Sequence, residues 1–171
     1  MAPQSIKPAL LIIDVQKIYL PSIAQRDKDI GYYFINHLIK LFRDNNLPVI
    51  RIYHTNAVTG PKPGTDEFEY PEAVMIKPED PRIIKTYSDS FNKTDLMKLL
   101  KEKETNTVFL CGQSAVGCVI ATFIGAMNND LKPFIVKDAI MCHNTDYSRN
   151  MEMMFNAVSL DAVKVMVEAA V

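Results

Sequence analysis

The stretch from Thr107 to Phe123 constrains the fold more than any other part of the chain. Val108 to Cys111 is a short apolar run with a β-branched start, which is typical of a buried strand. Gly112 ends this run, and Cys118 to Met127 has helical spacing of its apolar residues and no proline. The stretch therefore predicts a strand, a tight turn and a helix, with Cys118 in the first helical turn.

A cysteine in that place has two interpretations. The free backbone N–H groups and the positive end of the helix dipole stabilise a thiolate there, which makes Cys118 a candidate nucleophile. Most free cysteines are instead small buried apolar residues without a chemical role. The stretch alone leaves both interpretations open.

Length and composition favour a single soluble domain, which we expect to span residues 1–171. The 19 basic and 20 acidic residues nearly balance, so nucleic acid and anionic membranes are not expected partners. Three cysteines, without paired metal-ligand spacing, favour reduced thiols in a cytoplasmic protein. Residues 1–8 lack the features of a signal peptide, and no apolar run has the length of a membrane span.

Strand-like and helix-like segments alternate along the rest of the chain, which predicts a parallel sheet with helices on both faces. The expected strands are Ala9–Ile13, Val49–Tyr53, Arg82–Lys85, Val108–Cys111, Phe134–Asp138 and Val163–Val167, and the expected helices are Ile30–Arg43, Asp95–Lys103, Cys118–Met127 and Tyr147–Leu160.

Residues 55–81 interrupt this alternation. Five prolines and two glycines between Gly60 and Pro81 forbid a long regular element. A long irregular loop in a compact domain is usually a lid or a binding loop. The sequence does not separate a lid over the site from a contact with another subunit.

Polar residues at the predicted strand ends point to a site. Asp14, Lys85 and Cys118 each follow or end a strand, and a parallel sheet brings its carboxyl ends to one edge, where such folds bind ligands. Asp14 could instead only cap the next segment of the chain, and His54, which follows the second strand, could be structural. A Cys–His pair of Cys118 with His54 or His143 also stays open. The spacing of the histidines predicts no metal site, and no glycine-rich phosphate loop is present.

Four pieces of the chain, in this order and spacing, resemble the isochorismatase-like cysteine hydrolases over nearly the whole length. They are Leu-Leu-Ile-Ile-Asp14-Val-Gln, the segment from Lys85-Thr-Tyr-Ser-Asp-Ser-Phe to Leu96, Phe-Leu-Cys-Gly112 with Cys118-Val119 after it, and Val136-Lys-Asp138-Ala139. The resemblance implies a Rossmann-like, three-layer α/β/α fold with a six-stranded parallel sheet.

The resemblance also implies a catalytic triad of Asp14, Lys85 and Cys118. Asp14 would take the thiol proton, and Lys85 would favour the charged forms of both neighbours and so lower the pKa of the thiol. An oxyanion hole would come from the backbone N–H groups of Ser114 and Cys118, next to a cis peptide bond between Gln113 and Ser114.

Further candidates for contacting the substrate are Gln16, Tyr19, His54 and Gln113. Members of the family commonly form homo-oligomers, so we expect one here, with the proline-rich loop and the methionine-rich last helix as possible contact surfaces.

The sequence departs from common patterns of this family in three ways. A Thr and an Asp or Asn often precede the nucleophile, where this chain has Ala115 and Val116. The Asp-x-His metal pattern of the nicotinamidase branch is missing around His54, which argues against a metal cofactor. Retention of Cys118 favours acyl chemistry, since the branch that cleaves the vinyl ether of isochorismate often lacks this cysteine.

We therefore predict a cysteine hydrolase without a cofactor, acting on a small amide or a similar C–N bond. The alternatives are vinyl-ether cleavage and a catalytically silent scaffold or redox protein of the same fold.

Overall fold

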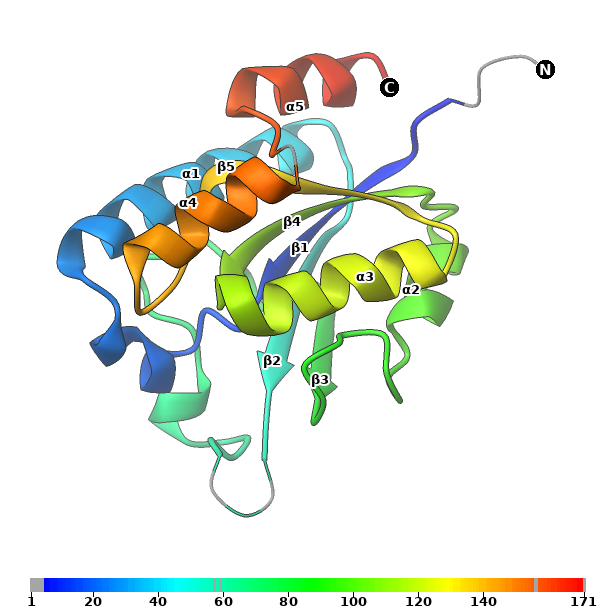
Figure 1. The fold of residues 1–171 in the computed structure, drawn as a ribbon. Helices are drawn as coiled ribbons and strands as arrows, with labels where there is room; N and C mark the ends of the chain where they lie inside the picture. Colours follow the sequence, from blue (N-terminus) through cyan, green and yellow to red (C-terminus); the bar gives the residue numbers. More distant parts are fainter. Residues whose placement is uncertain (1–4, 57, 59, 156, 171) are drawn as a thin grey trace.

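The central strand β1 (Pro8–Ile13) organises a five-stranded parallel sheet in the computed structural model (Figure 1). The structure describes residues 5–56, 58, 60–155 and 157–170. The prediction that residues 1–8 are no signal peptide therefore falls partly outside the described residues, since residues 1–4 are not among them. The order across the sheet is β3-β2-β1-β4-β5. The other strands are β2 (Val49–His54), β3 (Arg82–Lys85), β4 (Thr107–Gln113) and β5 (Lys132–Met141).

All six residues of β1 are buried, as a strand covered on both faces should be. Side chains alternate along the strand. Leu10 and Ile12 pack into one hydrophobic core, whereas Leu11 and Ile13 pack into the other. The continuous apolar run of the sequence thus serves two cores at once.

Five α-helices of the described residues form the outer layers. The helices α1 (Gln25–Asp44) and α5 (Leu160–Glu168) contribute their apolar sides to the core that contains Leu10. The helices α2 (Leu96–Glu102), α3 (Ile120–Asn128) and α4 (Thr145–Met154) contribute to the core that contains Leu11 (Figure 1). The parallel sheet with helices on both faces, predicted from the alternation of segments, is confirmed, and so is the three-layer α/β/α architecture that the resemblance implies.

The expected sixth strand is wrong, because Val163–Val167 lies inside helix α5. Ser159 caps this helix by accepting a hydrogen bond from the Ala162 N–H at 3.2 Å. Val163 and Val167, four residues apart, are buried, while Val165 between them is 67% exposed. A short apolar run fits a strand or one face of a helix, and in the structure Val163 and Val167 pack into the core from one helical face.

The described residues of the long loop from 55 to 81 are irregular, as expected, apart from a short 3₁₀ turn η2 (Asp66–Phe68). Its second half is anchored rather than open: Phe68, Tyr70 and Val74 are part of the core. The Tyr70 hydroxyl lies 2.8 Å from the carbonyl oxygen of Ile12 and 2.7 Å from that of Ile52. The hydroxyl contacts of Tyr70 therefore hold this part of the loop against the carboxyl-terminal ends of β1 and β2.

Among the described residues, no helix is both long enough and apolar enough to cross a membrane.

Candidate active site

The candidate site lies at the carboxyl ends of the strands, where the chain order reverses. From β1 the sheet continues to β2 and β3 on one side and to β4 and β5 on the other. The loops leaving β1 and β4 must therefore diverge, and the crevice between them is where open α/β sheets bind ligands. Asp14 follows β1, and the segment with Cys118 follows β4.

Close approach of β4 to β1 requires a glycine at position 112. Gly112 has φ +111°, and a Cβ atom there would lie 2.2 Å from the carbonyl oxygen of Ile13. Gln113, next along the chain, donates a hydrogen bond from its side chain to the carbonyl oxygen of Asp14 at 2.9 Å. These contacts fix Asp14, which itself adopts a left-handed backbone with φ +51°.

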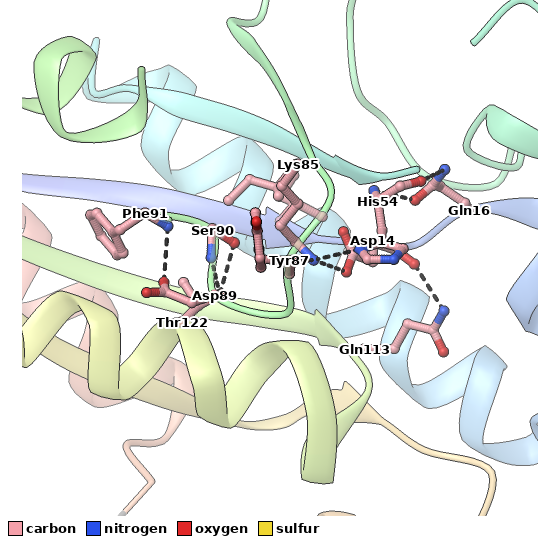
Figure 2. A network of polar contacts seen from close by, with 12 residues as sticks. Asp14, Gln16, His54, Lys85, Tyr87, Asp89, Ser90, Phe91, Gln113 and Thr122 are labelled. Carbon is pink, nitrogen blue, oxygen red and sulfur yellow. Dashed lines mark hydrogen bonds and ion pairs between the residues drawn. The ribbon is translucent and has the colours of Figure 1, made fainter. Parts of the chain in front are cut away.

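Lys85 reaches Asp14 across an intervening strand. It ends β3, opposite His54 in β2, and β2 separates β3 from β1. Two strand spacings amount to about 10 Å, a gap that a long side chain and a carboxylate can bridge together. The Lys85 Nζ lies 2.7 Å from Asp14 Oδ2, and the lysine side chain is fully buried (Figure 2).

Cys118 lies in an irregular turn rather than in a regular first helical turn. A π-helical turn, Ala115–Val119, precedes α3, and Gly117 within it has non-helical dihedral angles. Before this turn, the peptide bond between Gln113 and Ser114 is cis, at the position that the resemblance implies. The Cys118 sulfur, an Asp14 oxygen and a His54 ring nitrogen all lie within 4.8 Å of one another. The structure thus brings Asp14, Lys85 and Cys118 together.

The expected lowering of the Cys118 pKa is wrong. Burial, followed by the negative charge of Asp14, raises the pKa of the thiol to about 12, and the opposing effect of Lys85 is smaller. Burial likewise raises the pKa of Asp14, against the opposing effect of Lys85. The resting state at neutral pH therefore contains a protonated thiol rather than a free thiolate.

A pocket of about 300 Å³ opens in front of the Asp14 carboxylate and the Cys118 sulfur. Of the candidate substrate contacts, Tyr19, His54 and Gln113 line it. The complete lining is Asp14, Tyr19, Ser22, His54, Ser88, Gln113, Ser114, Cys118 and His143. Burial, then the charges of Asp14 and Cys118, raises the pKa of Tyr19 to about 12, so its phenol stays neutral.

Gln16 has a different place from the one expected. Its side chain is fully buried, does not line the pocket, and bonds the backbone of His54 in both directions. The amide nitrogen donates to the His54 carbonyl oxygen at 3.0 Å, and the amide oxygen accepts from the His54 N–H at 2.7 Å (Figure 2). Gln16 thus positions His54.

Sequence reasoning missed Ser22, Ser88 and His143 as residues that line the pocket. His143 was considered only as a partner of Cys118. The rule used for Asp14 would have found His143 as well, because it follows the carboxyl end of β5 at Met141. The sequence prediction ended that strand at Asp138, three residues too early.

A metal ion is a poor occupant of this site. Asp14, His54 and Cys118 are close enough to share one, but the Lys85 ammonium already contacts two of them. A dication there would face a buried positive charge at close range, which is costly in a low dielectric. The donor set therefore fits an Asp–Lys ion pair beside a thiol better than a metal site.

Comparison with known proteins gives a matching family model and a similar curated protein. The family model described as "Isochorismatase domain" matches residues 8–163. A Pseudomonas chlororaphis protein named "Probable isochorismatase" is 26% identical over 171 residues, which covers 90% of this chain and 80% of that protein.

Two solved structures show the same fold. One is a cysteine hydrolase from Pseudomonas syringae pv. phaseolicola, with a TM-score of 0.82, 18% identity and full coverage of both chains. The other is N-carbamoylsarcosine amidase from Thermoplasma acidophilum, with a TM-score of 0.75 and 21% identity. That match covers 90% of this chain and 95% of the amidase.

Proposed function

Because the chain belongs to the isochorismatase family and is a hydrolase, we propose that it cleaves a C–N bond of a small amide through a thioester on Cys118. The observation that carries the proposal is the buried 2.7 Å ion pair between Lys85 and Asp14, placed beside a cysteine at the mouth of a small pocket. The name of the structurally similar amidase denotes the same class of reaction.

In this proposal Asp14 acts as the base. Its Oδ2 is held by Lys85, while Oδ1 is buried and has no hydrogen-bond partner among the described residues. Oδ1 is therefore the oxygen available for the proton of the Cys118 thiol. Since the thiol is not ionised at rest, the proton moves as sulfur attacks the carbonyl carbon.

The remaining steps return the proton and the thiol. The carbonyl oxygen becomes an oxyanion facing the backbone N–H groups of Ser114 and Cys118. When the C–N bond breaks, protonated Asp14 gives its proton to the leaving nitrogen. Asp14 then takes a proton from water, whose oxygen attacks the thioester and forms the carboxylic acid, and the released Cys118 recovers the proton.

Throughout the cycle, Lys85 keeps the summed charge of the site low. In the resting state its ammonium pairs with the Asp14 carboxylate. When the proton lies on Asp14, the same ammonium faces the developing negative charge on sulfur or on the oxyanion. The reaction needs a buried cation in reach of both groups. The proposal assigns this part to Lys85, which pairs with Asp14 and whose charge lowers the pKa of the Cys118 thiol against the larger effect of burial.

The test is a screen of small amides, N-carbamoyl amino acids and ureides for ammonia release, with Cys118→Ala as the matched control. We expect at least one compound to be hydrolysed by the native chain and none by the variant. Equal ammonia release by both proteins would reject the cysteine mechanism.

Vinyl-ether hydrolysis is a second candidate, favoured by the raised pKa of Asp14 and by the similarity to the probable isochorismatase. That reaction needs a carboxylic acid to protonate the double bond and does not need a thiol. Retained turnover of isochorismate in Cys118→Ala, with loss in Asp14→Asn, would support it over amide cleavage. Inactivity of the native chain on all compounds would favour the silent scaffold.

We also propose that the chain forms a homo-oligomer. Large apolar side chains are exposed on neighbouring helices, on α3 and its preceding turn and on α4. They are Val116, Ile124, Met127, Met153 and Met154. Light scattering should give a mass of at least two chains, and the mass of one chain at micromolar concentration would reject this proposal.

A further inference from the structure

Among the residues that the structure describes, three acceptors lie within hydrogen-bond distance of the Lys85 ammonium, which has three N–H bonds. They are Asp14 Oδ2 at 2.7 Å, the carbonyl oxygen of Tyr87 at 3.2 Å and His54 Nδ1 at 3.3 Å (Figure 2). An ammonium group only donates hydrogen bonds. His54 must therefore accept through Nδ1, and the proton of its neutral ring lies on Nε2.

The His54 ring is held in this arrangement from its own backbone. The side chain of Gln16 binds both the N–H and the carbonyl oxygen of His54, and β2 sets His54 opposite Lys85. A rotation of the ring by 180° would place a carbon atom against the ammonium and leave one buried N–H bond without its acceptor. Leaving a buried charged donor without an acceptor is costly, so the observed orientation is favoured.

The charges around the ring keep it neutral. Burial and the Lys85 ammonium lower the pKa of His54, while the Asp14 carboxylate and the Tyr87 carbonyl oxygen oppose them with smaller effects. Cys118, the other titratable group close to the ring, is a neutral thiol in the resting state. An imidazolium ring would place two cations 3.3 Å apart in a buried site.

We infer that His54 is a positioning residue for Lys85, locked as the Nε2–H tautomer, and that it gives the pocket a neutral hydrogen-bond donor. His54 lines the pocket, and with Nδ1 facing Lys85 the remaining polar group of its ring is Nε2–H. The substrate group that faces the ring is then an oxygen acceptor, a carbonyl or a carboxylate, rather than an amine or an N–H group. The claim about substrate rests on the proposed function, whereas the tautomer and the positioning of Lys85 do not.

The first test needs no turnover. Long-range ¹H–¹⁵N spectra of ¹⁵N-labelled protein show which ring nitrogen carries the proton, and His54→Asn assigns the signal among the three histidines. We expect a neutral His54 with the proton on Nε2 at pH 7 and pH 8, and protonation of the ring only below its ordinary pKa of about 6.5. A proton on Nδ1, or a charged ring at pH 7, would overturn the inference.

The second test separates the two roles of the ring. In His54→Asn the amide oxygen replaces Nδ1 as acceptor, but no donor remains at the position of Nε2. We expect kcat to stay within about threefold and KM to rise about tenfold, which corresponds to ~1.4 kcal/mol for one hydrogen bond. In His54→Phe both roles are lost, and kcat should fall as well. His37→Asn, at an exposed histidine of α1, is the matched control and should change neither constant.

The outcomes distinguish failure of this inference from failure of the proposed function. If no substrate is found, the same variants are compared by the rate at which iodoacetamide alkylates Cys118 at pH 8. Loss of the acceptor in His54→Phe should slow alkylation at least fivefold, because Lys85 then holds the thiolate less well, and His54→Asn should match the native chain. Equal kinetics of the Asn and Phe variants in either assay would overturn the positioning role, and an unchanged KM in His54→Asn would overturn the donor role.

Discussion

Replacing Lys85 by methionine should leave a buried carboxylate without its partner. The side chains of Lys85 and Asp14 are 0% and 3% exposed, and the two charged groups lie 2.7 Å apart. Removing one member of a buried ion pair destabilises proteins by about 3–5 kcal/mol, because the remaining charge stays in a low dielectric. Methionine fills nearly the same space, so the loss measures charge rather than packing.

The destabilisation should depend on pH in a defined direction. Burial already raises the pKa of Asp14, and loss of Lys85 removes the largest opposing effect, so its folded-state pKa rises further. A carboxyl whose pKa is higher in the folded than in the unfolded state favours folding at low pH, and this stability is lost as the pH rises through the folded pKa.

Urea unfolding of the native chain and of Lys85→Met at pH 5, 7 and 8 measures this effect. The variant should lose about 3 kcal/mol at pH 8 and less at pH 5, because a carboxyl with a raised pKa is protonated to a larger extent at the lower pH. In Asp14→Asn/Lys85→Met most of the loss should be recovered. The matched control is Lys40→Met, since Lys40 pairs with Asp44 at 2.6 Å on an exposed face of α1. That change should cost less than about 0.5 kcal/mol at every pH. A Lys85→Met penalty no larger than the control, or one independent of pH, would refute the reasoning.

Two further substitutions test backbone geometry and buried hydrogen bonding, and one reaction tests the ionisation of the Cys118 thiol. Gly112→Ala should destabilise the fold by more than about 3 kcal/mol in urea unfolding, since φ is +111° and a Cβ would meet the Ile13 carbonyl oxygen; a loss below about 1 kcal/mol would contradict this. Thr122→Val should cost about 1–3 kcal/mol in the same assay, because its hydroxyl bonds the buried N–H and hydroxyl of Ser90 (Figure 2), and an unchanged midpoint would argue against it. Alkylation of Cys118 by iodoacetamide, followed by peptide mapping, should still rise with pH above pH 10, because the thiol pKa is about 12; a plateau below pH 8 would show a thiolate at rest.

The fold and the convergence of three site residues could be predicted from local patterns. The sequence shows the apolar run of β1 and the polar residues that follow the strands. The burial of β1 follows from its apolar run, and the parallel topology brings the polar residues to one edge of the sheet. The segment Val163–Val167 could not be resolved in this way. Five residues with alternating valines satisfy both periods, and only packing against α1 and β5 selects the helix.

The electrostatics of the site could not be predicted from the order of residues. A helix end and a lysine near Cys118 suggest a lowered pKa of its thiol. The burial of the thiol and the nearby charge of Asp14 raise this pKa instead. The role of Gln16 was hidden for a similar reason, since its partner is the backbone of His54, 38 residues away. Pairings between distant loops leave no local pattern.

The central claim is that Cys118 is the nucleophile, and intact-protein mass spectrometry of a rapidly quenched reaction tests it most directly. With a substrate found by ammonia release, the native chain should show an added acyl mass that maps to the peptide containing Cys118 and disappears on treatment with hydroxylamine. Cys118→Ala should show neither the added mass nor ammonia release. Steady ammonia release by Cys118→Ala, at a rate within about tenfold of the native chain, would contradict the account.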